Sequence, residues 1–355
     1  MEKLLKHGGN IYELIEKYGF EKEKIIDFSS NVNVFFDFEK IKDMIISSIE
    51  NIFFYPDSQY KKTREKIAEK FSVSYKNVIL GNGSIELIYL IPKALKLKKS
   101  IIFIPTFSEY ERSIKLNGGK ILFLKTKEED NFKIRIDEIL KYKSFFDSIF
   151  LCNPNNPTGF YIEKEKIIEI LKKNRDEIFL IDEAFIDFTE KESLVSEIKK
   201  YKNLLILRTF TKIFPIPGLR IGYLIGDENL TKIISKYIYP WNINSLAENI
   251  AQKLIDFELK EIKKRIKEEK EYIYRNLKIL QGVKVFNGEA NFFLIKIERD
   301  INFKFFIEKL KSKGILVRDC SNIKGLGRNF IRICVRKRNE NEKFLNELKC
   351  LLYQQ

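Results

Sequence analysis

Short apolar runs alternate with longer amphipathic stretches through the middle of this 355-residue chain, and this alternation constrains the fold more than any other feature. Strands that alternate with helices predict a mostly parallel central sheet covered by helices on both faces, so the predicted fold class is α/β. Helical periodicity is found, among other places, near 136–143 and 164–173. The runs expected to form strands are 77–80, 101–104, 120–124, 148–153, 178–182 and 204–207.

A smaller α+β unit is expected after this alternation ends. The helical pattern from 245 to about 280 fits either one bent helix or two helices. Short apolar runs then predict strands near 283–286, 292–297, 315–318 and 330–335. We therefore expect a large α/β domain over 40–240. We expect a small domain built from 1–39 together with 241–355.

One turn, between 203 and 222, combines a lysine with hydroxyl groups and an arginine. Thr209 and Thr211 flank the turn, Lys212 lies inside it, and Arg220 follows eight residues later. Ligands bind where the strands of an α/β sheet end. A lysine beside a phosphate cradle suits pyridoxal phosphate, whose aldehyde reacts with an amine. The alternative is a solvated loop lysine.

Three further strand ends carry polar groups. Gly83 and Ser84 lie in a Gly-Asn-Gly-Ser turn that opens a helix, a geometry that binds phosphate but also occurs in many ordinary turns. Asn156 lies in the Pro-rich loop 153–159 and could donate to the 3-oxygen of a pyridine ring. Asp182 ends a buried strand, where a carboxylate needs a partner, such as a protonated pyridine nitrogen. A helix cap is the alternative role for Asp182.

The two ends of the chain contribute other candidates. His7, the only histidine, precedes two glycines that indicate a close backbone approach. A cluster of serines and asparagines at 29–33 fits either a plain turn or a site. Arginines stand at the ends of the predicted C-terminal strands, at Arg318, Arg332 and Arg336.

Composition narrows the classes of function. The formal net charge is +15, but basic residues are interleaved with acidic ones, so solvated helix faces explain the charge better than nucleic-acid binding does. The excess still favours an anionic substrate. Four cysteines without CxxC spacing predict a reducing cytoplasm and no metal site. No leader-like or 18-residue apolar run is present, so we expect neither export nor a membrane span.

Five motifs together resemble one superfamily in order and spacing. They are GNGS, PTF, NPNNPTG, IDEA, and TFTK followed by GLR. The chain resembles the fold-type-I pyridoxal-phosphate-dependent aminotransferases over nearly its whole length. Within them it is similar to the histidinol-phosphate aminotransferase group. It is more similar to the threonine-phosphate decarboxylases, through HGGNIYELIEKYG, DFSSNVN and the region from GILVRDCSNIKGLG to FIRICVRKRNENEKF.

The resemblance implies a role for each matching residue. Lys212 would be the Schiff-base lysine, Asp182 the pyridinium partner, and Phe107 the residue stacked on the ring. Asn156 would bond the ring 3-oxygen, and Tyr55 would reach the cofactor phosphate of a neighbouring subunit, which implies a homodimer. The cofactor phosphate would be held by Gly83, Ser84, Thr209, Thr211 and Arg220. The substrate would meet His7, Asn31, Arg318 and, through its carboxylate, Arg332.

Two departures from the aminotransferase pattern bear on the reaction. Phe185 stands where a tyrosine usually bonds the 3-oxygen, and Val34 replaces a proline. The resemblance implies decarboxylation of L-threonine O-3-phosphate to (R)-1-aminopropan-2-yl phosphate in cobalamin biosynthesis. The phosphate of that substrate would be bound by a basic cluster of His7, Arg318, Lys324, Arg328 and Arg336. The alternatives are transamination of histidinol phosphate with 2-oxoglutarate and a cofactor-sensing transcription regulator, which would need a helix-turn-helix segment.

Overall fold

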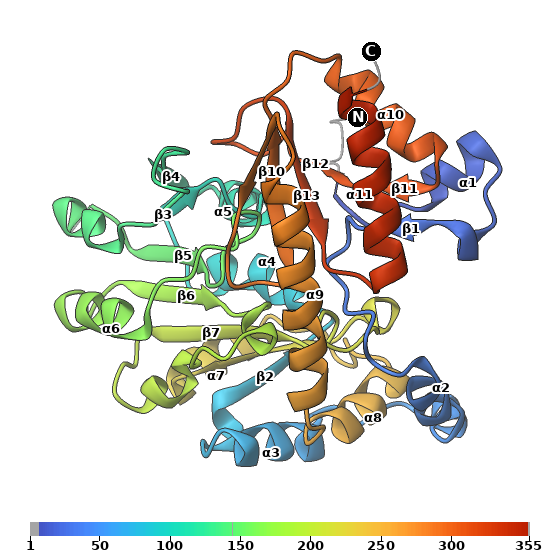
Figure 1. Ribbon diagram of the computed structural model, residues 1–355. Helices are drawn as coiled ribbons and strands as arrows, with labels where there is room; N and C mark the ends of the chain where they lie inside the picture. The colour runs from blue at the N-terminus through green and yellow to red at the C-terminus, as the bar shows by residue number, and fades with distance from the viewer. Residues whose placement is uncertain (1–6, 144, 354–355) are drawn as a thin grey trace.

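A seven-stranded sheet forms the centre of the larger unit in the computed structural model, which describes residues 7–143 and 145–353 (Figure 1). The strand order is β2-β8-β7-β6-β5-β3-β4. All neighbours pair in parallel except β8, which is antiparallel to both β2 and β7. The strands are β2 Val78–Gly81, β3 Lys99–Ile104, β4 Lys120–Lys125, β5 Ser148–Cys152, β6 Ile178–Asp182, β7 Leu204–Thr209 and β8 Gly222–Gly226.

Burial explains why most strands of the central sheet are almost continuously apolar. Every residue of β2, β5, β7 and β8 is buried, as expected for strands that helices cover on both faces. Helix α4 contacts β7 and β8, whereas α5 contacts β3 and β4. The helices of this unit are α2 Phe38–Ile46, α3 Lys61–Lys70, α4 Ser84–Ala94, α5 Glu109–Leu116, α6 Lys164–Lys173, α7 Glu228–Ser235 and α8 Ser245–Leu254.

The second unit combines the two ends of the chain, blue and red in Figure 1. Strand β1 (Ile26–Asp27) pairs in parallel with β11 (Ile315–Leu316), and α1 (Tyr12–Tyr18) contacts α10 (Phe303–Ser312). A separate four-stranded antiparallel sheet has the order β12-β13-β10-β9. Its elements are β9 Val283–Phe286, β10 Phe292–Ile297, β12 Arg318–Asp319 and β13 Phe330–Cys334, flanked by α9 Lys260–Lys278 and α11 Arg338–Tyr353. The domain limits at 40 and 240 stay a prediction, and 1–6 and 354–355 lie outside the described residues.

Two local features differ from, or resolve, the sequence predictions. The segment predicted as a helix near 136–143 forms a 3₁₀ helix, Ile136–Tyr142. Its buried residues Ile136 and Ile139 are three apart, which suits the three residues per turn of that helix. The pattern from 245 to 280 forms two helices, α8 and α9. Across the described residues, no helix is both long and apolar enough to cross a membrane.

Candidate active site

A cavity of about 1560 Å³ opens where strands of the central sheet end. It is bounded by the turn after β7, the end of β6 and the loop after β5, and the second unit closes it with β12 and β13. Segments far apart in sequence therefore meet there. The predicted site residues that line it are His7, Asn31, Ser84, Phe107, Asn156, Asp182, Thr209, Thr211, Lys212, Arg220, Arg318 and Arg332.

Lys212 is half-buried, and its amine lies in this cavity. Its Nζ donates a hydrogen bond of 2.8 Å to the carbonyl of Ser30, in the loop 29–33. Burial, and then the nearby guanidinium groups of Arg332 and Arg220, lower the pKa of Lys212 to about 8. A larger fraction of the amine is therefore uncharged near neutral pH than for an exposed lysine, and an uncharged amine is the nucleophile that a carbonyl requires.

Asp182 is buried at the end of β6, with one hydrogen bond to each carboxylate oxygen. Oδ2 accepts from the Tyr110 hydroxyl at 2.7 Å, and Oδ1 accepts from the backbone N–H of Ala184 at 2.9 Å. Burial raises the pKa of Asp182 to about 6, although both hydrogen bonds act to lower it. Each oxygen keeps a free lone pair, so a cationic partner would stabilise the carboxylate. Asp182 can therefore accept the cap-like hydrogen bond from Ala184 and still bind a cationic ligand.

Arg220 and the turn that precedes α4 form a candidate anion site, in which position 83 has no room for a side chain. Gly83 has a φ of +71°, and a Cβ there would lie 2.4 Å from Arg220 Nη2. Ser84 starts α4, whose N-terminal end is favourable for an anion. The hydroxyl oxygens of Thr209 and Thr211 lie 2.9 Å apart on the other side. In the described residues Arg220 has no carboxylate within ion-pair distance, so its charge is available to a phosphate group.

Two buried arginines lie opposite each other on β12 and β13. Arg318 pairs with Arg332 in the register of the two strands, and their side chains are 8% and 7% exposed. Arg332 donates to Asn156 Oδ1 and to the carbonyl of Ser29, and burial lowers its pKa to about 10. The bond to Asn156 leaves the amide nitrogen of that residue as a donor. Arg318 donates to the carbonyl of Asp319 at 2.6 Å and to Asn322 Oδ1 at 2.8 Å. Among the described residues neither arginine forms an ion pair with a carboxylate, so the positive charge of both can be balanced by a bound anion.

The N-terminal segment lies directly against the loop 29–33. A Cβ on Gly8 would be 2.0 Å from the carbonyl oxygen of Ser29, and Gly9 N–H donates to Ser29 Oγ at 2.7 Å. The two glycines thus make the predicted close approach, which places His7 at the cavity wall, 5.8 Å from the Phe107 ring centroid. Asn31 has a φ of 56°, and its buried side-chain oxygen has no partner in the described part of the chain.

Some predicted residues are not brought to the cavity. Tyr55 is 80% exposed and contacts Trp241, with the two rings tilted and their centroids 4.7 Å apart. Within the basic cluster, Lys324 pairs with Glu111 at 2.7 Å, and Arg328 lies outside the cavity lining. The cavity does reach Arg336, but this guanidinium already binds Glu340 and the carbonyl of Asp27. His7 and Arg318 are thus the members of that cluster best placed for an anion.

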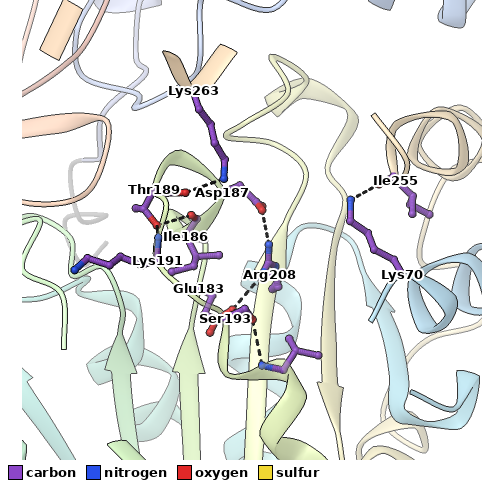
Figure 2. A network of polar contacts seen from close by, with 12 residues as sticks. Lys70, Glu183, Ile186, Asp187, Thr189, Lys191, Ser193, Arg208, Ile255 and Lys263 are labelled. Atoms are coloured by element: carbon purple, nitrogen blue, oxygen red, sulfur yellow. Dashed lines mark hydrogen bonds and ion pairs between the residues drawn. The ribbon is translucent and has the colours of Figure 1, made fainter. Parts of the chain in front are cut away.

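A network of ion pairs and hydrogen bonds lies at the ends of β6 and β7, around Arg208 (Figure 2). Because side chains alternate along a strand, Glu183 and Arg208 point away from the cavity that their neighbours Asp182 and Thr209 line. Arg208 donates to Glu183 at 3.0 Å and to Asp187 at 2.5 Å. The network joins the ends of the two strands that carry the candidate cofactor residues.

The fold and this site define a class of protein, and comparison with known proteins agrees. The sequence model of the family Aminotransferase class I and II matches residues 23–348, and the chain belongs to that family. It is therefore a pyridoxal-phosphate-dependent enzyme, and the predicted superfamily, fold class and cofactor are confirmed. The candidate anion site, the Lys212 amine with its lowered pKa and the buried Asp182 carboxylate fit this cofactor.

Relatives with two kinds of name resemble the chain. A Caldanaerobacter subterraneus protein provisionally named threonine-phosphate decarboxylase is 37% identical to this chain, over 98% of this chain and 94% of that protein. Identity is also 37% to the adenosylcobalamin biosynthesis bifunctional protein CobDQ of Leptospira interrogans, over 99% of this chain but only 41% of that protein. A Thermoanaerobacter histidinol-phosphate aminotransferase is 36% identical over 88% of each chain.

Solved structures of proteins with the same two names superpose on this chain. Histidinol-phosphate aminotransferase from Clostridium acetobutylicum superposes with a TM-score of 0.85 at 32% identity, covering 92% of this chain and 99% of that one. L-threonine-O-3-phosphate decarboxylase from Porphyromonas gingivalis superposes with a TM-score of 0.83 at 26% identity and the same coverage. The enzyme is thus a decarboxylase or an aminotransferase of this family.

Proposed function

We propose that this enzyme decarboxylates L-threonine O-3-phosphate to (R)-1-aminopropan-2-yl phosphate, as a step of cobalamin biosynthesis. The observation that carries the proposal is the pair Arg318 and Arg332, two buried cations with no acidic partner in the described residues. A substrate with one carboxylate and one phosphate group supplies one anionic group to each of the two arginines. The relatives named for threonine phosphate and for cobalamin support this choice.

The cofactor, when bound, supplies an electron-accepting ring beside the bond that breaks. Lys212 would bond its aldehyde, Asp182 its pyridine nitrogen, and the Asn156 amide its 3-oxygen. Phe107 would pack on one ring face. The cofactor phosphate would be held by Gly83, Ser84, Thr209, Thr211 and Arg220.

The substrate would be oriented by the second unit. Arg332, fixed by Asn156 and Ser29, would hold the carboxylate with two parallel hydrogen bonds, a geometry that lysine cannot provide. Arg318 and His7 would hold the phosphate, and Asn31 would accept a hydrogen bond from the substrate. Lys212 would return a proton to Cα after carbon dioxide leaves, because its lowered pKa suits proton transfer near neutral pH.

We also propose a homodimer in which Tyr55 of the partner subunit reaches the cofactor phosphate. Tyr55 contacts Trp241, and both side chains are exposed, as are Phe53, Phe54 and Tyr239 close by in the sequence. Exposed apolar side chains that lie together mark interaction sites. Four free cysteines support a reducing cytoplasm as the location.

Histidinol-phosphate aminotransferase is the second candidate, because relatives with that name are nearly as similar. Incubating the purified holoenzyme with L-threonine O-3-phosphate separates the two. Carbon dioxide release without any keto acid supports the proposal, whereas turnover that requires 2-oxoglutarate supports the aminotransferase.

A further inference from the structure

Glu109 is a buried carboxylate in the cavity wall to which the proposed function gives no role. It is the first residue of α5 and is 5% exposed. Three side chains converge on it: His7 Nε2 lies 2.8 Å from Oε1, the Tyr89 hydroxyl hydrogen-bonds to Oε2, and Arg112 lies 3.8 Å from Oε2. These partners come from separate segments of the chain.

The carboxylate fixes a hydrogen on one nitrogen of the His7 ring. Burial would raise the pKa of Glu109, but hydrogen bonds from His7 and Tyr89 outweigh it, so the net effect lowers the pKa. An ionised carboxylate only accepts hydrogen bonds, so Nε2 of His7 must be the donor. The other ring nitrogen, Nδ1, has no hydrogen-bond partner within the described residues. It can donate to a phosphate oxygen only when both ring nitrogens carry a hydrogen.

Without Glu109, little would hold this imidazole in place. The His7 side chain is 41% exposed, and its other ring contact is the tilted Phe107 ring at 5.8 Å. The backbone beside it is fixed, because Gly8 and Gly9 lie on Ser29. The backbone thus delivers His7 to the cavity, and Glu109 sets the orientation of its ring.

We propose that Glu109 is a positioning residue that orients His7 toward the phosphate group of the substrate and so selects phosphorylated over unphosphorylated amino acids. The inference rests on the proposed function, which places His7 at that phosphate. Arg112, 3.8 Å from Oε2, offsets part of the negative charge of Glu109. With Nε2 bound to Glu109, His7 donates to the phosphate through Nδ1, which requires a hydrogen on both ring nitrogens.

The test compares Glu109→Gln with wild type as full-length holoenzyme. The amide keeps the size of the side chain but loses the charge, and a charge-assisted hydrogen bond is worth about 1.5–3 kcal/mol, a factor of roughly 10 to 150. We expect KM for L-threonine O-3-phosphate to rise at least about tenfold, with kcat nearly unchanged. The parameters for L-threonine and the cofactor absorbance should stay the same.

Two further variants separate positioning from helix stability. Glu111→Gln removes a carboxylate from the same first turn of α5, but Glu111 pairs with Lys115 and Lys324 outside the cavity, so KM should not change. In a His7→Ala background, Glu109→Gln should have no further effect on KM, because its target is gone. An unchanged KM in Glu109→Gln, or an equal loss with and without His7, overturns the inference.

Binding distinguishes this inference from the proposed function. Calorimetric titration of the holoenzyme with inorganic phosphate, L-threonine O-3-phosphate and histidinol phosphate reports the anion site whatever reaction follows. If wild type binds these ligands without decarboxylation and Glu109→Gln weakens binding, the inference stands and the proposed function fails. If wild type binds none of them, or the variant binds equally well, the inference fails.

Discussion

Replacing Gly83 with alanine tests whether Arg220 and the turn that precedes α4 form one phosphate site. A Cβ at this position would lie 2.4 Å from Arg220 Nη2 and 3.1 Å from its Cζ. These atoms are the far end of a flexible side chain, so the fold can accept the methyl group if the guanidinium moves aside. The substitution therefore acts chiefly on the position of Arg220.

The expected loss follows from the contact that is displaced. A hydrogen bond between a guanidinium and a phosphate contributes about 1.5–3 kcal/mol, so the affinity for pyridoxal phosphate should fall roughly 10- to 150-fold. The positive φ adds strain of about 1–3 kcal/mol, which lowers stability. Titrating the cofactor-free protein with pyridoxal phosphate and following the absorbance of the complex measures the affinity.

Gly118→Ala is the matched control. Gly118 has a φ of +73°, but an added Cβ would meet no atom within 4 Å. Both variants should unfold at lower temperature than wild type, and only Gly83→Ala should lose cofactor affinity. Equal cofactor affinity in the two variants would refute the assignment of Gly83 and Arg220 to one phosphate site.

Two further predictions concern buried charges. Arg208→Met leaves Glu183 and Asp187 without their shared cation, so the free energy of unfolding, measured with denaturant, should fall by about 3–5 kcal/mol. The control is Arg135→Met, which removes an exposed ion pair and should lower the free energy of unfolding by under about 1 kcal/mol. A loss of under 1 kcal/mol in both variants would contradict the network's role. Because folding raises the pKa of Asp182 to about 6, its ionised form destabilises the cofactor-free fold above that pH. Asp182→Asn should therefore be more stable than cofactor-free wild type at pH 7, and the difference should shrink as pH falls from about 6 to 4; a difference independent of pH would contradict this.

The sequence predicted the residues that stand at strand ends. Parallel strands end at one edge of a sheet, so Asn156, Asp182 and Lys212 had to lie near each other once the alternation was recognised. The antiparallel direction of β8 was not predictable in this way, because a short apolar run does not reveal which way its strand runs.

Contacts between distant segments escaped prediction for a related reason. Tyr110 binds Asp182 across 72 residues, and Glu109 binds His7 across 102. Periodicity reports only which face of an element is buried, not what that face meets. The rings of Phe107 and Tyr110 are in contact, with centroids 5.5 Å apart, but Phe107 precedes α5, so helical periodicity did not link the two residues.

The central claim is that the enzyme removes the carboxylate of a phosphorylated amino acid. The most direct measurement follows carbon dioxide release from carboxyl-labelled L-threonine O-3-phosphate by purified holoenzyme with no keto acid present. We predict labelled carbon dioxide in equal amount to 1-aminopropan-2-yl phosphate, with both abolished by Lys212→Ala. No carbon dioxide, together with a keto product that forms only when 2-oxoglutarate is added, would contradict the claim.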